Sequence, residues 1–247
     1  MNMTTDEQEN AANHILHGNG FTRLREIISP DEASTIRDDL LQKTDAAREM
    51  GTGVLGITDL VTAGPEFIEL VTHPRLLAVA HALLGADATL GAFSARILMP
   101  GCEEGKLHVD YPYWAMNPGM PVAPAMMMQV IWMMEPFSEE NGGTWVAPGS
   151  QQWPTPTDPT RFAGHAVQAT GNAGDAIISH GLLWHRTAHN HSQQPRVAIL
   201  INYTQLAIRP MVQMGPFSEE FQERASPELR RLLAFDQAAA LRARLAY

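Results

Sequence analysis

The feature that most constrains this chain is a change of texture after Gly85, where helical spacing gives way to short apolar segments. These segments are rich in β-branched or aromatic residues and are separated by Gly, Pro and Asn, as in the stretch Asn141-Gly142-Gly143. Such a pattern is typical of short strands that are joined by tight turns. Six strands are predicted, over residues 89–99, 106–110, 126–134, 144–146, 176–179 and 196–204.

Helical patterns flank this β-rich region on both sides. Ser29 and Pro30 predict a capped helix start, two shorter helices are expected over 65–71 and 74–84, and helical spacing returns after Pro210. The first dozen residues are expected to lack regular structure. Strands braced by helices indicate a mainly β fold, either a β-sandwich or a jelly roll. We predict one domain over 1–247, with a helical part to about 85, a core over about 86–210 and helices over about 211–247.

Charge and cysteine content restrict the partners of the chain. Its 27 acidic and 17 basic residues give a net charge of −10, which disfavours nucleic acid and anionic membranes as partners. Cys102 is the single cysteine, so internal disulfides and cysteine-based metal clusters are excluded. Residues 1–10 are polar, and no apolar run is long enough to cross a bilayer. We therefore expect a cytoplasmic protein whose partner is a small molecule.

One histidine of the ten has an aspartate two residues later. If 106–110 is the end of a strand, His108 and Asp110 point to the same face, about 7 Å apart, and can converge on one metal ion. The pair leaves a third ligand to find. An ordinary surface pair at a strand end is the alternative interpretation.

A second histidine-rich stretch supplies candidates for that ligand. His185 is favoured because Arg196 follows eleven residues later and opens an apolar strand. Its rivals are His180, which is the strongest, His189 and His191. Four clustered histidines might be a zinc site in principle, but their spacing fits no zinc pattern.

The strand that begins at Arg196 has two different faces. Counting by two, Arg196 shares a face with Ala198, Leu200, Asn202 and Thr204, which indicates a polar interior site in a barrel. Two histidines and one carboxylate leave three positions of an iron ion open, and an α-keto acid can occupy two of them. A buried guanidinium would then bind the free carboxylate of that acid. An ion pair at the barrel rim is the alternative role of this arginine.

Several motifs follow one another between about Phe93 and Tyr203. They are His108-Val109-Asp110, Glu140-Asn141-Gly142-Gly143-Thr144-Trp145-Val146-Ala147-Pro148-Gly149-Ser150, Gly174-Asp175, His185-Arg186-Thr187-Ala188-His189-Asn190 and Pro195-Arg196. In this order and spacing they resemble the phytanoyl-CoA dioxygenase family of iron(II)/2-oxoglutarate oxygenases. Residues 20–40 also look like the opening strand and helix of that family.

The resemblance implies a double-stranded β-helix core, which is a cupin-like jelly roll. It also implies an enzyme that uses iron(II), 2-oxoglutarate and O2 to hydroxylate an unactivated C–H bond of a small organic metabolite, such as one of secondary metabolism, releasing succinate and CO2. Related halogenases have a small residue where this chain has Asp110, so halogenation is not expected. The implied residues are His108, Asp110 and His185 for iron, and Arg196, Thr187 and, more weakly, Gln129 for 2-oxoglutarate.

Some features leave the substrate and reaction open. Gln151 stands where the family often has His, and the strand around 126–128 is rich in methionine. Tyr111, Tyr113 and Trp114 follow the metal motif and would either contact substrate or form the barrel wall. Desaturation, epoxidation or cyclisation would use the same residues. The alternatives are a jelly-roll metalloenzyme without 2-oxoglutarate, such as a ring-cleaving dioxygenase or an isomerase, and a non-catalytic metabolite-binding module.

Overall fold

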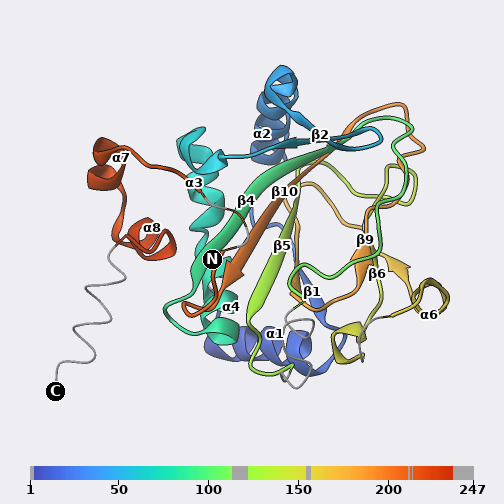
Figure 1. The fold of residues 1–247 in the computed structure, drawn as a ribbon, viewed down its shortest axis with the longest axis horizontal. Coiled ribbons are helices and arrows are strands. Elements are labelled where there is room, and N and C mark those ends of the chain that lie inside the picture. The colour runs from blue at the N-terminus through green and yellow to red at the C-terminus, as the bar shows by residue number, and fades with distance from the viewer. Residues whose placement is uncertain (1–2, 113–121, 154–156, 211, 213, 236–247) are drawn as a thin grey trace.

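The computed structural model describes residues 3–112, 122–153, 157–210, 212 and 214–235 of the chain. Its centre is an antiparallel sheet in the order β1-β8-β5-β10-β4-β3-β2, beside a smaller sheet in the order β7-β6-β9 (Figure 1). The large sheet consists of β1 (Phe21–Leu24), β2 (Arg48–Gly51), β3 (Val54–Ile57), β4 (Thr89–Leu98), β5 (Met127–Met133), β8 (Ala176–His180) and β10 (Arg196–Thr204). The small sheet consists of β6 (Trp145–Val146), β7 (Val167–Gln168) and β9 (His185–Arg186).

Helices pack on one face of the large sheet. The N-terminal helices α1 and α4 contact each other, and α4 also contacts β5 and β10. Within the described residues no single helix is long and apolar enough to cross a membrane, although α3 and α4 together would be by length and composition, as a bent pair. The helices are α1 (Thr5–His17), α2 (Pro30–Gln42), α3 (Pro65–Val71), α4 (Pro74–Leu84), α6 (Pro159–Ala163), α7 (Glu219–Arg224) and α8 (Pro227–Leu232).

The two faces of β10 have different surroundings, as counting by two predicts. Val197, Ile199, Ile201 and Tyr203 are buried in the core between the sheet and the helices. Arg196, Ala198 and Leu200 instead line a cavity on the other face. A second apolar cluster joins the two sheets, with Ile131 and Ile177 from the large one and Val146 from the small one. This arrangement confirms the predicted jelly roll braced by helices.

The N-terminal helices show one correct and one wrong prediction. α2 begins as expected, since the Ser29 hydroxyl accepts from the Glu32 amide and the Glu32 carboxylate accepts from the Ser29 amide. The first dozen residues, however, are not irregular, because α1 begins at Thr5 with the same capping box between Thr4 and Glu7. Polar residues dominate α1, so its apolar spacing is weak in sequence. Ile15, which is fully buried, anchors it in the core.

Two strand predictions also need correction. The part before residue 86 is not only helical: β1 is the opening strand that the family resemblance implies, and β2 and β3 add two strands that were not predicted. The predicted strand over 106–110 is an irregular segment, in which His108 alone forms an isolated antiparallel bridge, with His185. The amides of Gly105 and Tyr111 donate to carbonyls of residues 187 and 181, so the segment still follows the chain around β9. Its hydrogen bonds are too widely spaced for a regular ladder.

Gln151 has a structural role in this fold rather than a place in the cavity. Its side chain is buried, and Nε2 donates to the carbonyl of Gly18 at 3.0 Å, just beyond the end of α1. We expect Gln151→Ala to lower the free energy of unfolding by about 0.5–1.5 kcal/mol, because the buried side chain loses its hydrogen bonds to the carbonyls of Ile15 and Gly18. Urea denaturation would measure this. The neighbouring Gln152 donates to the Leu16 carbonyl at 2.8 Å, but both the residue and this bond are exposed to water, so Gln152→Ala should cost less than about 0.5 kcal/mol. Equal losses in the two variants would contradict the proposed role.

Candidate metal and co-substrate site

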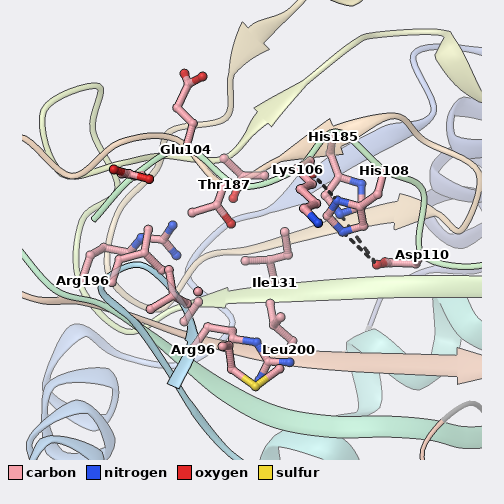
Figure 2. Close-up of a pocket in the computed structure, with 18 of the residues that line it drawn as sticks. Arg96, Glu104, Lys106, His108, Asp110, Ile131, His185, Thr187, Arg196 and Leu200 are labelled. Atoms are coloured by element: carbon pink, nitrogen blue, oxygen red, sulfur yellow. Dashed lines mark hydrogen bonds and ion pairs between the residues drawn. The ribbon is translucent and has the colours of Figure 1, made fainter. Parts of the chain in front are cut away.

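A cavity of about 600 Å³ lies on the inner face of the large sheet, and its volume is that of a small-molecule site. The strands β4, β5 and β10 supply one wall, and the segment that carries β9 supplies another. Figure 2 shows that His108, Asp110 and His185 gather at one end and Arg196 at the other. Thr187 lies between these two groups in the same view. The fold therefore brings the predicted metal ligands and the predicted co-substrate arginine into one cavity.

The three proposed metal ligands converge at one end of this cavity. Asp110 Oδ1 lies 3.9 Å from His108 Nε2 and 3.7 Å from His185 Nε2, and the donor atoms of all three residues lie within 4.8 Å of one another. The backbone causes this convergence, because His108 and His185 exchange N–H···O bonds of 3.0 Å across their isolated bridge. Among the described residues, no other group of three His, Cys, Asp or Glu side chains is arranged to hold a metal ion.

Both imidazole rings are oriented by the backbone. Nδ1 of His108 lies 2.8 Å from the Lys106 carbonyl oxygen, and Nδ1 of His185 lies 2.9 Å from the Leu183 carbonyl oxygen. A carbonyl only accepts, so each Nδ1 carries the proton and each Nε2 keeps a free lone pair that faces Asp110. Burial, and then the neighbouring His185 ring, lower the pKa of His108, which favours the neutral form that a metal requires.

Asp110 completes a donor set that fits a divalent iron ion. Its Oδ2 atom is buried and has no hydrogen-bond partner among the residues that the structure describes. A buried carboxylate oxygen without a partner is costly unless a cation or a proton satisfies it. Two imidazole nitrogens and one carboxylate are the ligands that non-haem iron(II) prefers when it leaves positions open for substrates. The residues present therefore fit an iron(II) ion at this position.

Arg196 lies at the opposite end, at the first position of β10. It is 3% exposed, its Nη2 donates to the Gly142 carbonyl at 2.7 Å, and its guanidinium carbon lies 4.2 Å from the centre of the Phe137 ring. Its Nε is buried and has no hydrogen-bond partner within the described part of the chain. Burial lowers the pKa of Arg196 to about 10, so the side chain stays charged at neutral pH. A buried cation with an unused donor suits a carboxylate ligand.

Glu135 lies near Arg196, and its titration should make the stability of the protein depend on pH. It accepts a hydrogen bond from the Val197 amide, and burial raises its pKa from 4.5 to about 7. The folded state thus holds a proton that the unfolded state releases, so stability falls as pH rises from about 4.5 through about 7. We expect Glu135→Gln, which mimics the protonated form, to be more stable than the parent protein at pH 8 by about 1–3 kcal/mol and similar to it at pH 5.

Urea unfolding of both proteins at the two pH values would test this prediction. The exposed Glu139 provides a matched control, because Glu139→Gln removes the same charge nearby without the same burial. A stability difference between the Glu135→Gln and parent proteins that does not change with pH would contradict the expected titration. A pH dependence that also appears in Glu139→Gln would assign the effect to general surface charge.

Thr187 and Gln129, the two weaker co-substrate candidates, both line the cavity but lie at different places. Thr187 lies between Arg196 and the histidines, where its hydroxyl suits the same carboxylate as the arginine. Gln129 is paired with Asn202 of β10, six residues beyond Arg196. Six residues of a strand span about 20 Å, which is too far for both side chains to bind one carboxylate group. Gln129 therefore suits a different ligand atom from the carboxylate that Arg196 would bind.

His180 was the strongest rival of His185 as a metal ligand, but both of its ring nitrogens are hydrogen-bonded to the backbone. Its Nδ1 accepts from the Leu182 amide at 3.0 Å and its Nε2 lies 3.0 Å from the Val122 carbonyl oxygen. Neither nitrogen is left for a metal, and burial lowers the pKa of this ring to about 4. His189 and His191 do not line the cavity and lie against each other, with ring centres 4.1 Å apart.

The aromatic group after the metal motif is only partly described. Tyr111 is buried in a cluster with Val109, Leu182 and Trp184, which favours the role of a wall residue over substrate contact. Tyr113 and Trp114 lie outside the described residues.

Arg96 is one of several cavity residues that were not predicted from the sequence. Arg96 lines the cavity from β4, where it is paired with Ala198 of β10. The signal that could have found it is the one that singled out Arg196, namely a lone arginine in an otherwise apolar strand. Its nearest strand neighbours on the same face, Ser94 and Leu98, are both buried.

A family model described as phytanoyl-CoA dioxygenase (PhyH) matches residues 16–198. The chain belongs to this family. Membership confirms the family predicted from the motifs and supports the predicted cofactors, iron(II), 2-oxoglutarate and O2. The match ends within β10, at the strand that carries Arg196.

Curated relatives of the chain are named as dioxygenases. Dioxygenase af480 of Aspergillus fumigatus is 33% identical over 169 residues, which are 67% of this chain and 54% of that protein. Dioxygenase trt7 of Aspergillus terreus is 28% identical over 199 residues, which are 75% of this chain and 69% of that protein. The chain thus spans about half the length of the first of these two relatives.

Solved structures share the fold. The α-ketoglutarate-dependent epimerase SnoN of nogalamycin biosynthesis aligns with a TM-score of 0.69 and 17% identity, over 87% of this chain and 94% of its own. The carbocyclase SnoK of the same biosynthesis aligns with a TM-score of 0.68 and 19% identity, over 92% of this chain and 95% of its own. These likenesses confirm the jelly-roll fold.

Proposed function

We propose that this protein is a mononuclear iron(II)- and 2-oxoglutarate-dependent dioxygenase that hydroxylates a C–H bond of a small organic metabolite. In this proposal His108, Asp110 and His185 hold the iron, and Arg196 with Thr187 holds the distal carboxylate of 2-oxoglutarate. The observation that carries it is the convergence of three donor atoms within 4.8 Å in the same cavity as a buried arginine. One oxygen atom of O2 would enter the alcohol and the other succinate, with release of CO2.

The bound iron and 2-oxoglutarate would supply the oxidising power, and the protein supplies their placement. The carbonyls of Lys106 and Leu183 keep both histidine rings in the tautomer that presents Nε2. Asp110 contributes the one negative charge of the ligand set. Arg196 is held by Phe137 and Gly142 before any ligand arrives, so little side-chain entropy is lost on binding.

A second outcome of the same chemistry also has support. The two solved neighbours are named as an epimerase and a carbocyclase, although both are α-ketoglutarate-dependent. The placement of the substrate above the metal decides which bond is made after hydrogen removal, so cyclisation, epimerisation or desaturation would need no other ligand set. Mass spectrometry separates hydroxylation, which adds 16 mass units, from desaturation or cyclisation, which both remove 2, and from epimerisation, which leaves the mass unchanged. NMR of the isolated product then distinguishes desaturation from cyclisation and identifies an epimer.

The proposed function predicts oxygen-dependent succinate from purified protein supplied with iron(II), ascorbate and 2-oxoglutarate. Uncoupled turnover should give a slow rate without prime substrate, and a candidate panel can then be screened for stimulation. In the absence of oxygen, 2-oxoglutarate should chelate the protein-bound iron and give a visible absorption band. A protein that shows neither the band nor succinate would contradict the proposal and favour the metalloenzyme without 2-oxoglutarate. A band without any turnover would favour the metabolite-binding module.

A further inference from the structure

Arg96 lies in the cavity, but the proposed binding of iron and 2-oxoglutarate does not use it. It is on the same inner face as Arg196, because Arg96 pairs with Ala198 and Arg196 pairs with Leu98. The two arginines therefore lie on neighbouring strands, two residues apart in register. Figure 2 nevertheless shows Arg96 beside Leu200, well apart from Arg196.

Hydrogen bonds explain why the two side chains diverge. Nη1 of Arg96 donates to Ser94 Oγ at 3.0 Å and to the Ala95 carbonyl at 2.9 Å, which turns the guanidinium toward the middle of β4. Arg196 instead donates to the Gly142 carbonyl, which lies outside β4 and β10. The absence of a side chain at Gly56 also gives Arg96 room, since a Cβ there would lie 3.1 Å from Nη1.

The remaining donors of Arg96 are free for a ligand. Among the described residues Arg96 forms no ion pair, and its hydrogen bonds use Nη1 alone. The side chain is only partly exposed, and burial lowers its pKa while the charge of Asp110 partly offsets this effect. In the loaded site, however, Asp110 neutralises iron. Arg96 is then a half-buried cation without a counterion among the residues that the structure describes.

A count of charges in the loaded site leads to the same conclusion. The two positive charges of iron(II) and that of Arg196 are balanced by Asp110 and the two carboxylates of 2-oxoglutarate. At the rim, Glu104 pairs with Arg186 at 2.8 Å, and Glu103 and Lys106 are exposed to water and of opposite charge. The positive charge of Arg96 thus remains for the substrate to balance.

The residues around Arg96 indicate that the substrate also has an apolar part. Leu200, Ile131, Val54 and Met50 line the same cavity and provide apolar contacts. We propose that Arg96 binds a carboxylate of the substrate, and that the substrate is an organic acid with an apolar body. This inference rests on the proposed function and adds the substrate class to it.

A matched pair of ligands can test the proposal before the natural substrate is known. The protein is loaded with iron(II) and 2-oxoglutarate without oxygen, and 3-phenylpropionate or its uncharged amide is titrated against the absorption band, with calorimetry as a second readout. The acid should bind about 10- to 100-fold more tightly than the amide. Arg96→Gln should abolish this preference and leave the affinity for 2-oxoglutarate unchanged, and Arg96→Lys should keep part of it. Arg48→Gln removes an exposed arginine outside the cavity and should behave as the parent protein.

Three results would overturn the inference. Equal binding of acid and amide by the parent protein, or no binding of either, would exclude an anion site for substrate. Loss of 2-oxoglutarate affinity in Arg96→Gln would assign the arginine to the co-substrate instead. Failure of the proposed function is a separate result, because the parent protein would then show no absorption band before any probe is added.

Discussion

Replacing Asp110 with alanine is expected to lower oxygen-dependent succinate formation by at least about a hundredfold. In the proposed site the change would leave two neutral histidine ligands and remove the negative charge that would hold iron(II). The protein should also lose most of its iron during gel filtration, which metal analysis would measure. Metal-free Asp110→Ala should not be less stable than the parent protein, because the lost carboxylate has a buried oxygen without a hydrogen-bond partner among the described residues.

The exposed Asp45 gives a matched control for this experiment. Asp45→Ala removes the same group at the surface and should keep both the iron and the rate. If Asp110→Ala retained stoichiometric iron and normal turnover, the metal would have to lie outside the His108, Asp110 and His185 group. An unfolded variant would be recognised by its circular dichroism before its activity is measured.

Replacing Arg196 with glutamine is expected to weaken 2-oxoglutarate binding by about 10- to 100-fold, because the distal carboxylate loses a charged, bidentate partner. The rate at saturating 2-oxoglutarate should change much less, since the iron ligands remain in place. Titration of the anaerobic absorption band would give the affinity, and initial rates would give KM and kcat separately.

A ligand pair separates this binding role from a structural one. 2-Oxopentanoate has the same chain length as 2-oxoglutarate but carries a methyl group in place of the distal carboxylate. The parent protein should strongly prefer 2-oxoglutarate, and Arg196→Gln should lose that preference. If the variant bound both ligands poorly but kept the preference, Arg196 would be important only for packing against Phe137 and Gly142.

The three residues that we propose as iron ligands could be singled out from sequence because their signals are local. His108 and Asp110 are two residues apart, and His185 was chosen from the motif that leads to Arg196. The exclusion of His180 as a metal ligand could not be predicted from local sequence. It depends on the Val122 carbonyl, fifty-eight residues away in sequence, which occupies the ring nitrogen that a metal would need.

Most of the features that were missed or wrongly predicted depend on contacts between segments that are far apart in the chain. Nothing local to Arg96 shows that its strand is paired with Ala198 of β10 or that Gly56 leaves it room. The strand over 106–110 was predicted from its composition, whereas its hydrogen bonds are set by the distant chain around His185. α1 was missed because most of its residues are polar, while its buried Ile15 contacts a core that only the folded chain forms.

The sequence by itself determined the fold class, the family and the chemical types of the site, because strand alternation, turn residues and motif spacing are properties of neighbouring residues. Period-two counting alone placed Arg196 on the face opposite Val197. Only the tertiary structure decided which side chains share the cavity, which histidine nitrogens are free and which cation has no counterion within the described part of the chain. Those properties depend on burial and on hydrogen bonds between segments far apart in the chain, and no local pattern encodes the distance between them.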